Sequence, residues 1–197
     1  NDGINLQVKR GEILSLLGEN GSGKTTLMNM ISGIYFPDEG HIFVDGKEVS
    51  IRSPKDSFDL GIGMIHQHFK LIDVMTAAEN IILGLKGSAV LDMKKVHKDI
   101  QELVDKYGFD LDPAQKVYTM SVSQKQTVEI VKMLYRGANI LILDEPTAAL
   151  DPIAESQLYE KYNEMTKGKS SVYISHRLAS TRFCDRILLI ADGKISE

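Results

Sequence analysis

The chain has 197 residues, of which 43% are hydrophobic and 25% charged, and these proportions are typical of a globular protein. Its net charge of −4 gives no general attraction for a phosphate backbone, so nothing in the overall charge favours nucleic acid as a partner. The single cysteine, Cys184, excludes an internal disulfide and a zinc site built on thiolates. No transmembrane helix or signal peptide is predicted. Because the chain opens at Asn1 without methionine, we expect it to be part of a longer protein.

The N-terminal part of the chain is predicted to consist mainly of short strands. Apolar and polar residues alternate over 4–8, as in a half-buried strand, and an apolar run follows the turn at Gly11. We expect this start to form an antiparallel meander with a parallel sheet behind it. The predicted strands are 4–8, 12–17, 41–44 and 62–66, and a helix over 26–31 follows the second of them.

Helical periodicity replaces this pattern from about Ile72 to Met133. Thr76 and Asp92 each precede a stretch with helical spacing of apolar residues, so we predict that they cap two helices. Ser121 or Ser123 is predicted to begin a third helix. The predicted helices are 77–83, 93–107 and one that starts near 122. We therefore divide the chain into an α-helical subdomain, 72–133, inserted in an α/β core formed by 1–71 and 134–197.

The C-terminal part returns to strands. The apolar run over 140–143 has no polar interruption, which suits a central parallel strand buried on both faces. Pro152 directly after Asp151 predicts the first turn of a helix that continues to about Lys167. A further strand is predicted over 171–175, followed by a hairpin of 187–190 and 194–196 that turns at Asp192-Gly193.

One stretch carries a specific chemical signal, because it fits the phosphate-loop pattern G-x-x-x-x-G-K-S/T between a predicted strand and a predicted helix. Its glycines let backbone N–H groups wrap around a polyphosphate, and the following helix adds the positive end of its dipole. Lys24 can reach the β- and γ-phosphates, and the Thr25 hydroxyl can hold Mg²⁺. The alternative is a glycine-rich turn that happens to precede a helix. The predicted nucleotide-binding residues are Gly18, Glu19, Asn20, Gly21, Ser22, Gly23, Lys24, Thr25 and Thr26.

Polar residues also follow three other predicted strands, and ligands of open α/β sheets bind at the carboxyl ends of strands. Asp144 can hold Mg²⁺ through a water, and Glu145 can accept a proton from an attacking water. Each residue has a structural alternative. Asp144 and Glu145 can cap the turn at Pro146, Gln67 can be a surface amide, His176 a structural histidine and Ser121 a helix cap.

The ordered set of motifs resembles the nucleotide-binding domain of ATP-binding cassette (ABC) proteins over essentially the whole chain. Gly18–Thr25 resembles Walker A, Ile140–Asp144 resembles Walker B, and Ser121-Val122-Ser123-Gln124 resembles the signature loop ahead of it. Gln67 matches the Q-loop glutamine, Glu145 the catalytic glutamate, Ala149-Leu150-Asp151 the D-loop and His176 the switch histidine. The resemblance implies a P-loop NTPase core with a parallel sheet, an N-terminal antiparallel β subdomain and an inserted α-helical subdomain.

The same resemblance implies a Mg²⁺-dependent ATPase and assigns a role to each matched residue. Lys24, Glu145, Gln67 and His176 would be catalytic, and Thr25, Gln67 and Asp144 would surround Mg²⁺. Ser121, Ser123, Gln124 and Asp151 would contact ATP across an interface with a second nucleotide-binding domain, in the same chain or in a homodimer.

Two segments, Gly63–Phe69 and Val128–Ala138, resemble the ATPase subunits of bacterial importers for simple sugars and nucleosides. Those subunits usually carry two cassettes, of which this chain would be the first. The resemblance implies transmembrane permease subunits as partners, an extracytoplasmic solute-binding protein as an indirect partner, and a peripheral location on the cytoplasmic face of the cell membrane. No nucleic-acid partner is implied.

The sequence departs from the family pattern in the signature region. Met120 replaces a usual leucine, Ser123 a usual glycine and Thr127 a usual arginine, and the aromatic residue that stacks on adenine would lie before Asn1. The serine adds a side chain where the backbone would approach a γ-phosphate. Ser123 therefore leaves open a regulatory cassette that binds ATP with weak hydrolysis. A second alternative, which does not depend on these departures, is a non-transport ABC ATPase of translation or DNA maintenance.

Overall fold

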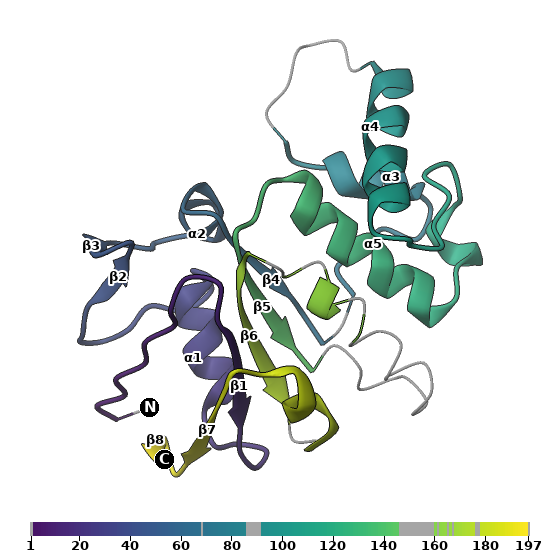
Figure 1. Cartoon of the computed structure of the whole chain (residues 1–197). Helices are drawn as coiled ribbons and strands as arrows, with labels where there is room; N and C mark the ends of the chain where they lie inside the picture. Colours follow the sequence, from purple (N-terminus) through teal and green to yellow (C-terminus); the bar gives the residue numbers. More distant parts are fainter. Residues whose placement is uncertain are drawn as a thin grey trace. The chain divides into compact units, whose positions relative to one another are not determined.

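The computed structural model describes residues 2–67, 69–85, 92–145, 160, 162–164, 166, 168–175 and 178–196, and Figure 1 labels its elements. The described residues form two compact units. The first comprises 2–64, 138–145 and those from 166 onward, and the second comprises 65–137, 160 and 162–164. The division at 72 and 133 that we expected from sequence remains a prediction.

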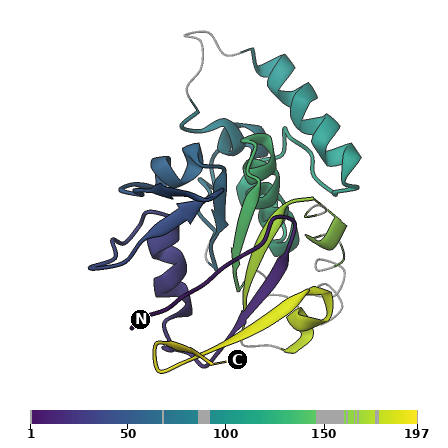
Figure 2. The same ribbon diagram turned by 60° about the vertical axis from the view of Figure 1, so that its left-hand side comes forward.

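A six-stranded sheet, in the order β4-β5-β6-β1-β7-β8, carries the phosphate-loop sequence at the end of one of its strands. β1 pairs in parallel with both β6 and β7, and β6 pairs in parallel with β5. β7 and β8 form the predicted antiparallel hairpin, which lies beside β1 in Figure 2. The strands of this sheet are β1 (Ile13–Leu17), β4 (Ile62–Ile65), β5 (Ile140–Asp144), β6 (Ser170–Ser175), β7 (Arg186–Ala191) and β8 (Lys194–Ser196).

The register of the sheet brings two predicted site segments to one edge. Leu17 at the end of β1 pairs with Ser175, and Asp144 at the end of β5 pairs with Ile174, so both strands end beside the end of β6. Leu14 and Ile142 are almost completely buried in the core, which explains why these strands read as continuous apolar runs. The predicted parallel sheet is therefore confirmed.

The segment over 4–8, which we expected to be a strand, is not one. Its alternation correctly separates the exposed Asn5 and Gln7 from Ile4, Leu6 and Val8, which pack against the core. Its carbonyls do not join a ladder; the Gln7 carbonyl instead accepts from the guanidinium of Arg186. The antiparallel part is instead the hairpin of β2 (Ile42–Val44) and β3 (Lys47–Val49).

Two helices of the first unit meet through a glycine. α1 (Lys24–Ile31) follows the phosphate-loop sequence as predicted, whereas α2 (Pro54–Asp59) was not predicted. Ser53 caps α2 by accepting from the Asp56 N–H, and Pro54 occupies its first turn. Gly33, with φ of 75°, lies so close to this cap that a Cβ would be 2.3 Å from the Ser53 carbonyl oxygen.

The second unit contains the three predicted helices, α3 (Ala77–Ile82), α4 (Met93–Lys106) and α5 (Val122–Tyr135). Thr76, Asp92 and Ser121 cap them through their side chains, as expected from sequence. Two short 3-10 helices were not predicted: η1 (Val117–Thr119) lies in this unit, and η2 (Leu178–Phe183) lies in the first. Most of the helix predicted after Asp151 lies outside the described residues, and the part that is described, 160, 162–164 and 166, is helical. Of the helices that are described, none combines the length and apolarity needed to cross a membrane.

The close approach at Gly33 predicts a stability difference between two glycines with the same backbone conformation. Gly11 has φ of 77° and open space around it, so we expect Gly11→Ala to lower the free energy of unfolding by about 1–2 kcal/mol. Gly33→Ala adds a clash with backbone atoms, and we expect a further loss of about 1–3 kcal/mol. Urea unfolding of the two variants measures the difference, and equal losses would contradict the packing of α1 against the cap of α2.

Candidate functional site

Lys24 is a buried cation at the start of α1, with only 5% of its surface exposed. Its Nζ atom donates to the carbonyl oxygens of Gly18 and Glu19, each at 2.8 Å, and lies 3.5 Å from the Ser22 hydroxyl. Burial lowers the pKa of this ammonium group, and the charges of Glu145 and Asp144 partly oppose that shift. The loop therefore curls around a positive charge whose burial is costly, and a bound anion would offset that cost.

The same loop leaves the N-terminus of α1 open to an anion. Gly23 is the N-cap residue, and among the described residues no side chain caps this helix and no acidic residue lies in its first turn. Its first N–H groups are thus available to a ligand, as in phosphate sites at helix N-termini. At Gly18 a Cβ would lie 2.3 Å from the Ile190 carbonyl oxygen, so the loop can pass this close to β7 only with glycine there.

Thr25 and Asp144 come together from the two sides of β6. The Thr25 hydroxyl donates to Oδ1 of Asp144 at 3.2 Å, and Asp144 is 5% exposed. Burial raises the pKa of the Asp144 carboxyl and Glu145 raises it further, whereas the hydrogen bond from Thr25 and the charge of Lys24 lower it. A buried carboxylate with a raised pKa beside a buried lysine is a typical feature of a functional site.

This oxygen pair fits Mg²⁺. Neighbouring ligands of an octahedral Mg²⁺ lie about 3 Å apart, given metal–oxygen distances of about 2.1 Å, and the two oxygens are separated by 3.2 Å. Across the described residues no group of three or more His, Cys, Asp or Glu could hold a metal without other ligands. Mg²⁺ at Thr25 and Asp144 would thus need further oxygens, and phosphate and water supply them.

Glu145 carries a strained backbone at the end of β5. Three described residues other than glycine have positive φ, and two of them, Asp45 and Asp192, precede a glycine in a hairpin turn. Glu145, with φ of 44°, lies instead directly after a buried strand, and its N–H donates to the Ile174 carbonyl at 3.0 Å. Strain of this kind persists where the surroundings fix it, and it concentrates at functional sites.

The predicted signature residues lie together at the start of α5 in the second unit. Ser121 is the N-cap residue and accepts from the Gln124 N–H at 3.2 Å, while the Gln124 side chain accepts from the Ser121 N–H at 3.1 Å. This capping box confirms the structural interpretation of Ser121. Ser123 is exposed, and its carbonyl accepts from the hydroxyl of the buried Thr127 at 3.0 Å.

The remaining predicted residues are placed as follows. Gln67 is exposed and belongs to the second unit, two residues beyond the end of β4. In the loop, Glu19, Asn20 and Gly21 are exposed, as are Thr25 and Thr26 after it. Asp151 and His176 lie outside the described residues, although β6, which leads to His176, ends between β1 and β5.

Sequence reasoning missed two polar side chains, Asn80 and Glu129, which are 1% and 4% exposed. Asn80 lies between Glu79 and the buried Ile81 in α3, and Glu129 lies between Val128 and Ile130, which are completely buried. For Glu129 the sequence did offer a signal, since a charged residue between two apolar helix positions is expected to be buried. A buried carboxylate requires hydrogen-bond partners, which would have marked Glu129 as a residue that holds another part of the chain.

The chain is similar to known proteins over most of its length. A family model described as ABC transporter matches residues 1–148. The nucleoside import ATP-binding protein NupA of Lactococcus lactis subsp. cremoris (strain MG1363) is 49% identical over 198 residues, which cover 98% of this chain and 39% of that protein. The guanosine import ATP-binding protein NupO of Bacillus subtilis (strain 168) is 50% identical over 198 residues, again covering 98% and 39%.

Solved structures resemble the fold as well. That of cbiO1 from Clostridium perfringens, described as part of the ABC transporter complex cbiONQ, has a TM-score of 0.84 at 28% identity. The match covers 99% of this chain and 79% of that chain. The curated relatives are longer, and the chain spans about two fifths of their length.

The raised pKa of Asp144 predicts that this carboxylate destabilises the folded protein at neutral pH. Its charge is favoured less in the folded than in the unfolded chain, so the cost is complete above the folded-state pKa, shrinks as the pH falls through that value, and is gone below the unfolded-state pKa. Asp144→Asn keeps an oxygen for Thr25, and we expect it to raise the free energy of unfolding at pH 7 by an amount that shrinks on acidification. Urea unfolding between pH 7 and pH 4 measures this, with the exposed Asp38→Asn as control. If Asp144→Asn is less stable than the parent at pH 7, the claim that the ionised Asp144 carboxylate destabilises the folded protein is wrong.

Proposed function

This chain belongs to the ABC transporter family, and on that premise we propose that it binds MgATP and hydrolyses it to power solute import. The observation that carries the proposal is the cluster at one edge of the sheet. There a buried Lys24 and the open N-terminus of α1 suit the phosphates, and the hydroxyl–carboxylate pair of Thr25 and Asp144 suits Mg²⁺.

Each residue of the cluster has a role in hydrolysis that follows from its chemistry. Lys24 would hold the β- and γ-phosphates in exchange for its present carbonyl partners. Thr25 and Asp144 would hold Mg²⁺, which when bound supplies positive charge to the reacting phosphoryl group. Glu145 would orient the attacking water and accept its proton, and the strained backbone after β5 would fix its position.

The remaining roles belong to Gln67, to residues that would face a second nucleotide-binding domain, and to Asp151 and His176, which lie outside the described residues. We propose that Gln67 senses the γ-phosphate and its Mg²⁺ and that His176 contacts the γ-phosphate. Ser121, Ser123, Gln124 and Asp151 would face the nucleotide of a second nucleotide-binding domain, in the same chain or in a second copy. In this arrangement 72–133 would act as the helical subdomain, and loss of the γ-phosphate would weaken the interface.

The proposed substrate class rests on the relatives. Two of them, about half identical to this chain, are named as import ATP-binding proteins for nucleosides and for guanosine. We therefore propose a solute of the nucleoside or sugar class, carried by transmembrane permease subunits and delivered by an extracytoplasmic binding protein. The chain would lie on the cytoplasmic face of the cell membrane as a peripheral subunit.

One observation favours a second candidate, a regulatory cassette with weak hydrolysis. Ser121 and Gln124 are already bonded to each other in the capping box, and Ser123 adds a side chain at the same helix start. A partner's phosphate would have to displace or adapt to these groups. Single-turnover hydrolysis by the complete protein decides between the candidates, because a regulatory cassette would retain its ATP without releasing phosphate.

The role of Glu145 predicts a loss of turnover without a loss of binding. In the complete protein assembled with its permease, Glu145→Gln keeps the size of the side chain but removes the proton acceptor, so we expect ATPase turnover to fall by about 10²–10⁴-fold. MgATP affinity should change little. The exposed Glu39→Gln serves as control and should match the parent. Turnover near the parent value in Glu145→Gln would contradict the general-base assignment.

A further inference from the structure

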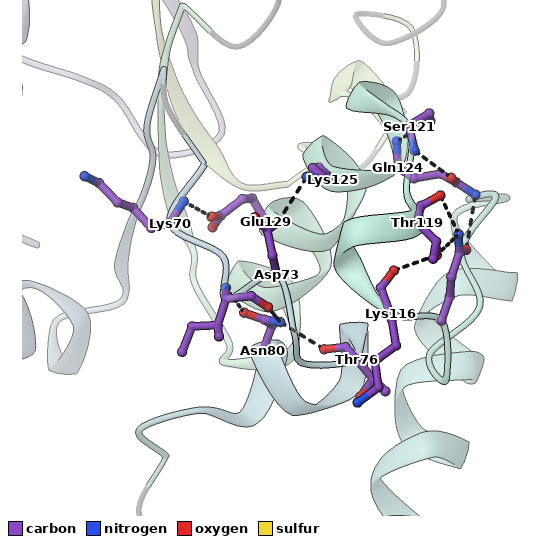
Figure 3. Close-up of polar contacts among 12 residues, drawn as sticks. Lys70, Asp73, Thr76, Asn80, Lys116, Thr119, Ser121, Gln124, Lys125 and Glu129 are labelled. Atoms are coloured by element: carbon purple, nitrogen blue, oxygen red, sulfur yellow. Dashed lines mark hydrogen bonds and ion pairs between the residues drawn. The ribbon is translucent and has the colours of Figure 1, made fainter.

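An irregular segment close to Gln67 is held by buried side chains of two helices. Residues 69–75, which we call the strap, contain neither helix nor strand and begin two positions after Gln67. Irregular backbone of this kind must find hydrogen-bond partners outside a regular ladder. Lys70 is bonded by Glu129 of α5 and Ile72 by Asn80 of α3; Figure 3 labels Lys70, Glu129 and Asn80.

Glu129 of α5 holds the strap at Lys70. Its carboxylate accepts from the Lys70 N–H at 2.7 Å, and its other oxygen lies 3.9 Å from Nζ of Lys132. The Lys132 ammonium in turn lies 3.5 Å from the Lys70 carbonyl oxygen. Both backbone polar groups of Lys70 are therefore held by one face of α5. A bond to a charged acceptor is stronger than a bond between neutral groups.

Asn80 of α3 holds the strap at Ile72. Its side-chain oxygen accepts from the Ile72 N–H at 2.7 Å, and its nitrogen donates to the carbonyls of Ile72 and Thr76, each at 3.0 Å. The amide thus occupies the position that a neighbouring strand would take. An amide is suited to this task because it both donates and accepts.

The strap is also joined to the loop that leads into α5. The Tyr118 N–H donates to the Asp73 carbonyl at 3.1 Å, and the Val117 N–H donates to the Met75 carbonyl at 3.0 Å. Lys125 of α5 lies 3.2 Å from the Asp73 carboxylate (Figure 3). Hydrogen bonds spaced along the strap therefore join it to Glu129, to Asn80, and to Val117 and Tyr118 in the loop before Ser121.

We propose that Glu129 and Asn80 are positioning residues, which fix the strap so that Gln67 and the start of α5 move as one body. The inference rests on the proposed function and extends it. When loss of the γ-phosphate displaces Gln67, the strap would move with it and would carry Ser121 along. The residues of the second unit would keep their positions relative to one another. Neither residue would touch the nucleotide; each acts through Gln67. Coupling of this kind requires contiguous contacts that hold their geometry, and buried, bonded polar side chains provide them.

The test uses the complete protein assembled with its permease. Glu129→Ala leaves the Lys70 N–H without its acceptor, and we expect about a tenfold fall in kcat for ATP hydrolysis. The KM for MgATP should stay within about twofold, because Lys24, Thr25 and Asp144 are unchanged. Glu129→Gln keeps an oxygen for Lys70 and should restore most of the turnover. Val104→Ala, a core truncation in α4 at a residue 2% exposed, controls for lost stability and should leave kcat within about twofold.

Hydrogen–deuterium exchange in the strap shows whether the bond has been broken. We expect faster exchange of the Lys70 amide in Glu129→Ala and not in Val104→Ala. Faster exchange with an unchanged kcat would overturn the proposal, and so would a fall in kcat that Val104→Ala matches. If Glu129→Ala does not fold, Asn80→Ala, which removes the partner of Ile72, decides in the same way, with about a tenfold lower kcat expected and an unchanged kcat overturning the proposal. Absence of ATPase activity in the unmutated assembly would instead contradict the proposed function itself.

Discussion

The candidate site in the first unit is built around one buried ammonium group, that of Lys24. Lys24 is 95% covered and is held by carbonyl oxygens of the loop that precedes it, while the carboxylates of Asp144 and Glu145 act on it through space. Burial of this charge raises the free energy of the folded chain, and the two carboxylates offset that cost only in part, so a bound nucleotide that brings further negative charge would lower it. The loop is therefore best understood as an anion-binding site. The stability that the folded chain loses by burying the Lys24 ammonium is the cost of keeping that site ready for its ligand.

The sheet supplies the geometry for that charge. β6 lies between β1 and β5, so the phosphate loop and Asp144 reach the same edge from opposite sides and meet through Thr25. The apolar strands are buried on both faces, and this packing fixes the positions of their ends. The polar residues at those ends are therefore held in place by the core. In the second unit, buried polar side chains perform the corresponding task for an irregular segment.

Much of this organisation could be predicted from the sequence, for reasons that differ between residues. Gly18–Thr25 and Asp144-Glu145 were identifiable because their spacing and their place at strand ends follow from local chemistry, and Thr76, Asp92 and Ser121 because capping depends on the next few residues only. The segment over 4–8 was wrongly predicted to be a strand, because the alternation of apolar and polar residues shows which side chains are buried but not whether the backbone pairs with another strand. Asn80 and Glu129 could not be matched to Ile72 and Lys70, since those bonds join residues that are 8 and 59 positions apart.

The central claim is that the buried Lys24 exchanges its carbonyl partners for the phosphates of a nucleotide. A crystal structure of the complete protein with Mg²⁺ and a non-hydrolysable ATP analogue tests it most directly. We expect the Lys24 ammonium to contact the β- and γ-phosphates, with Mg²⁺ beside Thr25 and Asp144. A nucleotide bound elsewhere, with Lys24 still held by the carbonyls of Gly18 and Glu19, would contradict the account.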